Sequence, residues 1–378
     1  MSANVIDPTP FAYSYPLLIK NLLRNPVRQF PDQEIVYSNF QRQRYRDLGE
    51  RVGRLASGLA RLGVKPGATV AVMDWDSHRY LECFFAVPMM GAVLHTVNIR
   101  LSPEQILYTI NHAEDDVILV NTEFLPILEA IRDRIEPVKK LVLLNDTEQI
   151  PATALDLSTD YETLLASGDP AYPFPDFSED TRATTFYTTG TTGLPKGVYF
   201  SHRQLVLHTF GILAALMGNG QGRFNRDDVY LPLTPMFHVH AWGVPYVATT
   251  LGVKQVYPGR YVPEHLLRLI EREKATFSHC VPTILQLLLA SPVVDDVDLS
   301  RWKVIIGGAA LPQALARQAR ARGVDVFTAY GMSETCPILT LAQLKPHMAD
   351  WDEERQLDIR CKTGLPVPMV ELRVVDED

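Results

Sequence analysis

Residues 184–198 read TTFYTTGTTGLPKGV and carry the strongest signal in this chain. Six of the first nine are threonine, so the run cannot build a core, but its groups suit a polyphosphate. Glycine lets backbone N–H groups approach phosphate oxygens. Threonine hydroxyls donate to those oxygens or bind a hard cation, and lysine adds a mobile positive charge. The candidate phosphate-binding residues are Thr188, Thr189, Gly190, Thr191, Thr192, Gly193 and Lys196.

This stretch is not a Walker-type loop, which needs glycine, four residues and then Gly-Lys-Ser/Thr. After Gly190, Pro195 takes the place of the second glycine and Gly197 that of the hydroxyl residue. A flexible surface loop is the alternative. Such loops seldom carry a lysine between proline and glycine and between two strand-like runs, residues 183–187 and 198–201. We therefore favour binding of nucleotide phosphates.

Strand-like and helix-like segments alternate on both sides of this stretch. Apolar residues recur with helical spacing over residues 48–62. A second helix starts at Ser102, which caps it, with proline in the first turn and Gln105 closing a capping box. Further predicted helices cover 203–217, 264–274, 283–290 and 313–322, and predicted strands cover 69–73, 116–121, 141–144, 183–187, 198–201, 229–233, 276–279 and 303–306.

Wholly apolar strands such as VILV and LVLL predict parallel sheets that are buried on both faces. We therefore expect an α/β fold of two stacked subdomains with mostly parallel sheets. The first would cover residues 1–182, with a Pro-, Asp-, Ser- and Thr-rich connection from residue 152. The second would cover 183–358 and hold the phosphate-binding stretch and a ligand pocket. Residues 359–378 would begin a small β subdomain, with 370–375 as one strand.

Composition limits the class of function. A chain of 378 residues with 46% hydrophobic and 21% charged residues is typical of a soluble globular protein. A net charge of −8 argues against nucleic acid as a partner. The four cysteines are far apart, without metal-ligand spacing, and fit buried thiols in a reducing cytoplasm. We expect no signal peptide and no membrane span. Peripheral membrane contact and a homodimer both stay open.

Further blocks follow in order along the chain. They read LPLTPMFH (231–238), GGAAL (307–311), YGMSET (330–335) and GLPVPMVELRVVDED (364–378). With YTTGTTGLPKGV (187–198), they resemble the signature of the adenylate-forming superfamily. That group contains acyl-CoA synthetases, firefly-type luciferases and the adenylation domains of peptide synthetases. PMFHVHAWG (235–243) is most similar to medium- and long-chain fatty acyl-CoA synthetases.

The resemblance implies an ATP-dependent acid–thiol ligase. The carboxylate of a fatty acid would attack the α-phosphorus of ATP, pyrophosphate would leave, and the acyl-adenylate would react with coenzyme A. Both reactants are anionic, so the site must neutralise charge and hold them in line. Mg²⁺ suits this task because it keeps waters and phosphate oxygens in its shell. The implied catalytic residues are Thr188, Glu334 and His238, of which Thr188 and Glu334 would hold the metal.

The family also implies where the nucleotide and the acyl chain bind. Small residues after the strand at 303–306, at positions 307–310, would form a floor for the adenine and the acyl group, where the bare sequence indicates only a tight turn. Tyr330 would stack on the adenine. His238 would position the substrate rather than transfer a proton. The remaining nucleotide residues would be Gly308, Ala309, Tyr330, Gly331, Met332 and Ser333, and the acyl pocket would comprise His238, Val239, Trp242, Gly307 and Gly308.

The same segment bears on substrate class. Amino-acid-activating relatives carry an aspartate just after the aromatic residue here, whereas this chain has His238, Val239, His240 and Ala241. An unpaired ammonium in an apolar pocket costs several kcal/mol, so an amino acid is not expected. Trp242 is either part of the core or a gate on an acyl tunnel.

Relatives continue beyond the strand that ends here at Asp378, into a ribose-binding segment, a hinge and a mobile C-terminal domain with a catalytic lysine. We therefore expect an N-terminal domain that by itself binds nucleotide weakly and adenylates little. Alternatives are an aryl or short-chain acid:CoA ligase, a luciferase-like oxygenase, or a non-catalytic nucleotide- or acyl-binding module. The resemblance also implies that residues 359–378 start a small β-barrel subdomain.

Overall fold

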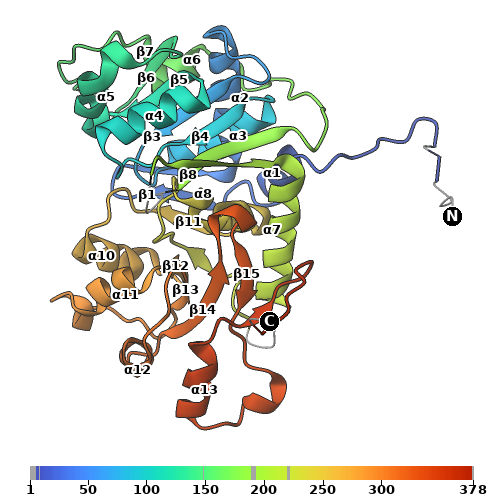
Figure 1. The fold of residues 1–378 in the computed structure, drawn as a ribbon, viewed down its shortest axis with the longest axis vertical. Helices are drawn as coiled ribbons and strands as arrows, with labels where there is room; N and C mark the ends of the chain where they lie inside the picture. The colour runs from blue at the N-terminus through green and yellow to red at the C-terminus, as the bar shows by residue number, and fades with distance from the viewer. Residues whose placement is uncertain (1–5, 8, 148, 189–192, 219–221, 377–378) are drawn as a thin grey trace.

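The computed structural model describes residues 6–7, 9–147, 149–188, 193–218 and 222–376. Two sheets are stacked along the long axis of the molecule, with helices around them (Figure 1). One apolar cluster continues from one sheet to the other, since both Val70 of the first and Phe277 of the second belong to it. A second buried cluster, which includes Ile306, packs on the nine-stranded sheet alone. This arrangement confirms the predicted α/β class with two mostly parallel sheets.

The seven-stranded sheet has the order β7-β6-β5-β3-β4-β8-β9. All neighbouring strands are parallel except β8 and β9, which form an antiparallel pair. Its strands are β3 (Thr69–Met73), β4 (Val93–Thr96), β5 (Asp115–Asn121), β6 (Lys140–Leu144), β7 (Thr159–Asp160), β8 (Arg182–Thr188) and β9 (Lys196–Ser201).

The nine-stranded sheet has the order β16-β15-β14-β13-β12-β10-β11-β1-β2. It is parallel from β14 to β1 and antiparallel at both ends. Its strands are β1 (Glu34–Tyr37), β2 (Gln41–Arg44), β10 (Val229–Tyr230), β11 (Lys254–Tyr257), β12 (Phe277–Cys280), β13 (Lys303–Ile306), β14 (Asp325–Gly331), β15 (Ile338–Leu341) and β16 (Leu365–Pro366).

The helices cover the faces of these sheets, and α7 runs from the level of β8 down the side of the nine-stranded sheet (Figure 1). It packs against α9 and β15. The helices are α1 (Lys20–Gln29), α2 (Tyr45–Arg61), α3 (His78–Met89), α4 (Pro103–Ala113), α5 (Leu125–Ile131), α6 (Tyr161–Ser167), α7 (His202–Met217), α8 (Val239–Trp242), α9 (Val244–Leu251), α10 (Pro263–Glu273), α11 (Pro282–Leu289), α12 (Gln313–Ala321) and α13 (Glu353–Arg360), with short 3-10 turns at Thr122–Phe124, Arg132–Arg134, Val294–Asp296, Ser333–Thr335 and Pro346–Met348.

Local sequence signals explain several of these elements. In α2, Leu48, Val52 and Leu55 are fully buried on one face, as their spacing predicts. In α4, Ser102 caps the helix and Gln105 closes the capping box, so this predicted start is confirmed. The predicted strand at 229–233 is shorter than expected and ends at Tyr230. Leu231 and Leu233 still donate to the Phe277 and His279 carbonyls at 2.9 and 3.3 Å, whereas Pro232 between them has no N–H to donate.

Two sequence expectations were wrong. The segment from residue 152 is not only a connection, because β7 and α6 lie in it. The Asp160 side chain accepts a hydrogen bond from the Thr163 N–H at 3.0 Å, which caps α6. Residues 370–375 do not form a strand, and Val374 is 93% exposed. An alternating sequence needs a partner strand, and the described part of the chain offers none beside it.

Sheet membership does not follow the linear subdomain boundaries. β8 and β9, which lie after residue 181, belong to the sheet of the first half, whereas β1 and β2, near the start, belong to the other sheet. Sheet membership alone does not set subdomain boundaries, so the division into residues 1–182, 183–358 and 359–378 stays a prediction.

Candidate active site

A cavity of about 220 Å³ opens at the carboxyl end of the nine-stranded sheet. Ligands of open α/β sheets bind outside the carboxyl ends of the strands, where strand order reverses. Here β10 leads to β11 on one side and β12 leads to β13 on the other. The cavity is lined by His238, Val239, Trp242, Gly307, Gly308, Ala329, Tyr330, Gly331, Met332, Ser333, Pro337 and Ile338.

Gly307, directly after β13, allows the Trp242 indole to lie close to the backbone. A Cβ at this position would sit 2.9 Å from Trp242 Cη2 and 3.3 Å from the Ala329 carbonyl oxygen. The indole is nearly buried and also lies 5.0 Å, between ring centres, from His279. Trp242 is therefore packed in the wall of the cavity, and its role as a gate stays a prediction.

The turn that carries Val239 and Trp242 has a left-handed backbone. The four residues of α8 have φ between 48° and 58°, and Gly243 follows at 72°. A left-handed conformation costs roughly 1–2 kcal/mol per non-glycine residue. Strained backbone of this kind gathers at ligand sites, where surrounding structure holds it in place. Figure 1 shows α8 at the junction of the two sheets.

His238 stands at the start of this turn, with its side chain exposed to the cavity. Surrounding protein atoms and the nearby Arg100 hold the pKa of its imidazole below the usual value. The imidazole is therefore neutral at physiological pH and can offer one N–H to a carboxylate. His240, two residues later, is buried among Phe84 and Phe186 and belongs to the core.

The opposite wall comes from the end of β14 and the turn after it. The register between β14 and β15 shifts at Tyr330 and Gly331. A Cβ at Gly331 would sit 1.9 Å from the Pro337 carbonyl oxygen, so only glycine fits there. Tyr330 is 41% exposed and lines the cavity.

A second, more apolar cavity of about 300 Å³ adjoins the first on the other side of Ile338. Apolar side chains of α7 and of the segment after β16 form most of its wall, and Glu334 stands at its edge. It is lined by Phe200, Gln204, Leu207, His208, Gly211, Ile212, Glu334, Thr335, Cys336, Ile338, Val367, Pro368, Met369 and Val370.

Glu334 is exposed, and no basic side chain among the described residues pairs with it. A free carboxylate is the kind of single protein ligand that Mg²⁺ takes when phosphates and waters complete its shell. The described residues contain no group of three or more His, Cys, Asp or Glu side chains able to hold a metal. Magnesium at Glu334 and Thr188 stays a prediction.

The phosphate-binding stretch lies between the antiparallel strands β8 and β9. Thr188 and Lys196 pair across the two strands, and the Thr188 hydroxyl donates to the Lys196 carbonyl at 3.4 Å. The Lys196 side chain is exposed, as is Gly193. Thr189, Gly190, Thr191 and Thr192 lie outside the described residues.

The structure thus brings together all five acyl-pocket residues and Tyr330, Gly331, Met332 and Ser333. Ala309 is exposed and does not line this cavity, and neither do Thr188, Gly193 and Lys196. Sequence reasoning missed Ala329, Pro337 and Ile338. Only proximity to Tyr330 and Glu334 along the chain hinted at them. The nucleotide, acyl and catalytic roles of all these residues stay predictions.

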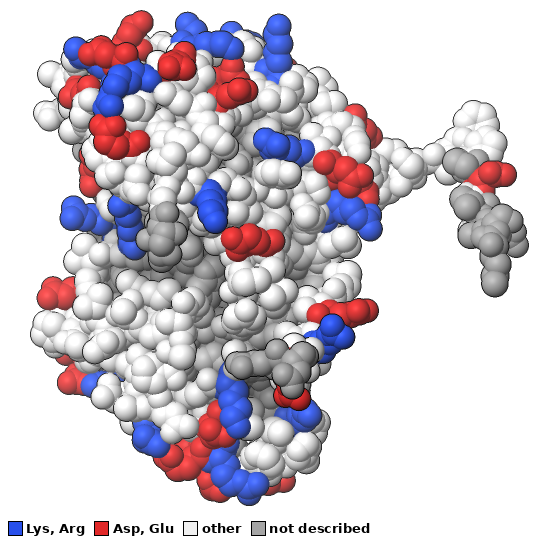
Figure 2. Space-filling view, viewed as in Figure 1, with Lys and Arg blue, Asp and Glu red and all other residues white. Residues whose placement is uncertain are grey.

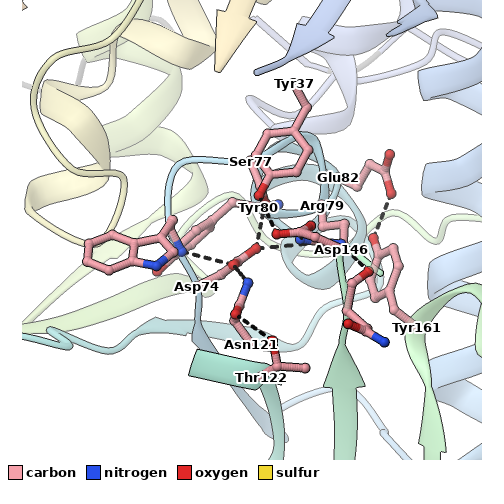
Figure 3. A network of polar contacts seen from close by, with 12 residues as sticks. Tyr37, Asp74, Ser77, Arg79, Tyr80, Glu82, Asn121, Thr122, Asp146 and Tyr161 are labelled. Carbon is pink, nitrogen blue, oxygen red and sulfur yellow. Dashed lines mark hydrogen bonds and ion pairs between the residues drawn. The ribbon is translucent and has the colours of Figure 1, made fainter. Parts of the chain in front are cut away.

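The carboxyl end of the seven-stranded sheet looks different (Figure 3). Its strand order reverses between β3 and β5, and polar side chains fill that place. Asp74 accepts hydrogen bonds from Ser77 Oγ at 2.6 Å and from Asn121 Nδ2 at 2.8 Å. Arg79 pairs with Asp146 at 2.5 Å.

Charges of both signs are interspersed over the two ends of the face in Figure 2. No described helix combines the length and apolarity needed to cross a bilayer. Cys83, Cys280 and Cys336 are buried and Cys361 is half-buried, all as free thiols. Burial raises the pKa of each of these thiols, which makes them inert.

Known proteins resemble this chain in sequence and in fold. A long-chain-fatty-acid–CoA ligase of Thermus thermophilus is 43% identical over 340 residues, which are 89% of this chain and 60% of that protein. A 3-methylmercaptopropionyl-CoA ligase of Ruegeria pomeroyi is 38% identical over 96% of this chain and 68% of its own length. The chain thus spans less than two thirds of the Thermus ligase.

A crystal structure of an anthranilate CoA ligase with anthranoyl-AMP superimposes with a TM-score of 0.81 at 22% identity. It covers 96% of this chain and 66% of that one, and it supports the fold alone. The family model described as AMP-binding enzyme matches residues 23–378. The chain therefore belongs to the AMP-binding enzyme family, whose relatives named above are CoA ligases.

Proposed function

We propose that this chain provides the adenylate-forming site of an AMP-forming acyl-CoA ligase that activates medium- or long-chain fatty acids. ATP and Mg²⁺ would form the acyl-adenylate, and coenzyme A would accept the acyl group. One observation carries the proposal. A single cavity combines the apolar wall of Val239, Trp242 and Gly307 with the turn that starts at Tyr330.

The chemistry follows from what the two walls offer. A carboxylate between them would meet the neutral imidazole of His238, whose N–H orients one oxygen without neutralising the nucleophile. Tyr330 would hold the adenine, so that the α-phosphorus lies beside the carboxylate. Lys196 and the threonines would bind the departing phosphates. Bound Mg²⁺ would supply charge neutralisation at the phosphates, with Glu334 as its carboxylate ligand.

Chain length is the finer part of the proposal. The adjoining 300 Å³ cavity, with Leu207, Ile212 and Val367 in its wall, supports an acid longer than the first cavity accommodates. A short-chain acid is the second candidate. It is favoured by the packing of Trp242 against Gly307 in the wall of the first cavity, and by the 38% identity to the 3-methylmercaptopropionyl-CoA ligase.

The test is mass-spectrometric detection of acyl-AMP and acyl-CoA from the complete gene product, offered ATP, Mg²⁺, coenzyme A and straight-chain acids of increasing length. The proposal expects product from medium and long acids. Product from short acids only would support the second candidate. Ligand binding without any pyrophosphate release would instead indicate a non-catalytic binding module. The Lys196→Met variant removes the charge proposed to bind the departing phosphates, and it serves as the control for phosphate binding.

A further inference from the structure

The segment after β3 reaches across from the seven-stranded sheet to the loop that carries His238. Asp76 is 2% exposed. Its Oδ1 accepts the Met236 N–H at 2.7 Å and its Oδ2 accepts the Tyr261 O–H at 2.6 Å. Its backbone carbonyl accepts the Gly259 N–H at 2.8 Å. Asp76, in the segment that follows β3 of the seven-stranded sheet, therefore forms hydrogen bonds with two separate segments of the nine-stranded half.

Thr96, the last residue of β4, makes a second bond to the same loop. Its buried hydroxyl donates to the Phe237 carbonyl at 3.1 Å. Met236 and Phe237 are the two residues directly before His238. The backbone that leads into the left-handed turn is therefore held at two adjacent residues, both by side chains from the opposite sheet.

Burial of the Asp76 carboxylate is costly for a purely structural group. Burial raises its pKa to about 7, Asp74 nearby adds to that rise, and the bonds from Tyr261 and Met236 together with Arg100 oppose it. In the described structure no basic side chain lies within ion-pair distance of this carboxylate. Ionisable groups perturbed in this way cluster at functional sites.

We propose that Asp76 and Thr96 are positioning residues, which hold the His238 turn against the acid substrate from the opposite sheet. The inference rests on the proposed function, since it assigns His238 to the carboxylate. His238 precedes a strained turn, so its imidazole keeps its place only if the backbone before it is fixed. A displacement of about 1 Å in such a group lowers turnover on the order of 100-fold.

The test measures pyrophosphate release by the complete gene product, with decanoate and ATP varied separately. Asp76→Leu removes both acceptors, whereas Asp76→Asn keeps one for the Met236 N–H. We expect Asp76→Leu to lower kcat/KM for decanoate roughly 10- to 100-fold with the KM for ATP unchanged. Asp76→Asn should stay within about threefold of the wild type. Equal losses in both variants would overturn the inference, because charge and not the hydrogen bond would then matter.

Thr96→Val keeps the inference testable if Asp76→Leu does not fold, since the change is nearly isosteric. Its matched control is Thr209→Val, another fully buried threonine, whose hydroxyl donates to the Leu205 carbonyl within α7. Only Thr96→Val should lower kcat/KM for decanoate. Equal activity of the two valine variants overturns the inference alone. A wild type that releases no pyrophosphate overturns the proposed function and this inference with it.

Discussion

The carboxyl ends of the two sheets differ, and only that of the nine-stranded sheet holds the candidate site described above. Both sheets reverse their strand order there, and both would suit a ligand. In the seven-stranded sheet Asp74, Asn121 and Arg79 occupy the place and bond to one another (Figure 3). In the nine-stranded sheet small residues such as Gly307 leave a cavity. Side-chain size and polarity, rather than topology, therefore distinguish the open end from the filled end.

The largest expected effect is a loss of stability on disrupting the polar network at the carboxyl end of the seven-stranded sheet. Asp74→Leu leaves the Ser77, Asn121 and Trp75 donors without their acceptor and removes a partner of buried Arg79. Breaking such a buried network costs about 3–5 kcal/mol. Urea denaturation should detect this loss of unfolding free energy. Glu354→Ala, which breaks an exposed pair with Arg317, should cost less than about 1 kcal/mol. Equal costs would mean that the network is not structural.

A larger side chain in the cavity at the carboxyl end of the nine-stranded sheet should cost less stability. The new Cβ of Gly307→Ala would meet the Trp242 indole at 2.9 Å, and overpacking of this kind costs about 1–3 kcal/mol. The double variant Gly307→Ala with Trp242→Phe should recover part of that stability, since the smaller ring withdraws from the contact. Purely additive losses in urea denaturation would show that the two side chains do not meet.

Asp76, which joins segments of the two sheets, should make the stability of the protein depend on pH. Its pKa is about 7 in the folded state and about 3.9 when unfolded. The folded state therefore binds more protons between these values, and its stability falls as pH rises through them, by about 1.4 kcal/mol per pH unit. Asp76→Asn lacks this titration. The stability of the wild type relative to Asp76→Asn should decline from roughly pH 4 to 7 and then level off. A constant difference would contradict the buried carboxylate.

The smallest expected effect concerns His238. Because the surrounding protein atoms and Arg100 lower the pKa of its imidazole, His238 should take up its proton at a lower pH than an ordinary histidine. Any fall in kcat/KM for decanoate that reports His238 should therefore be centred below pH 6.5, the ordinary histidine value, once the ionisation of the acid is allowed for. A clear fall centred at the ordinary value would mean that the imidazole is as solvated as a free one.

The sequence alone predicted much of the local structure. The Ser102–Gln105 capping box and the buried face of α2 depend on residues within one or two turns, so short patterns suffice. Helix α6 was missed because its Asp160 cap stands in a stretch rich in Pro, Asp, Ser and Thr, which is typical of loops. The error at 370–375 has the opposite cause, since alternation indicates a strand only where another strand pairs with it.

The site was harder to predict where it depends on distant residues. Asp76 and Met236 are 160 positions apart, and no local pattern joins them. Pro337 and Ile338 reach the cavity through the irregular β14–β15 pairing. The family motifs did locate the walls at 238–242, 307–308 and 330–333, because each follows or ends a strand of the same sheet.

A crystal structure of the 378-residue chain with 5′-O-(N-decanoylsulfamoyl)adenosine, a stable analogue of an acyl-adenylate, tests the central claim most directly. Our account predicts the acyl chain beside Trp242 and Gly307, the carbonyl group near His238 and the adenine against Tyr330. An analogue bound instead at the carboxyl end of the seven-stranded sheet, or a cavity left empty at saturating analogue, would contradict it.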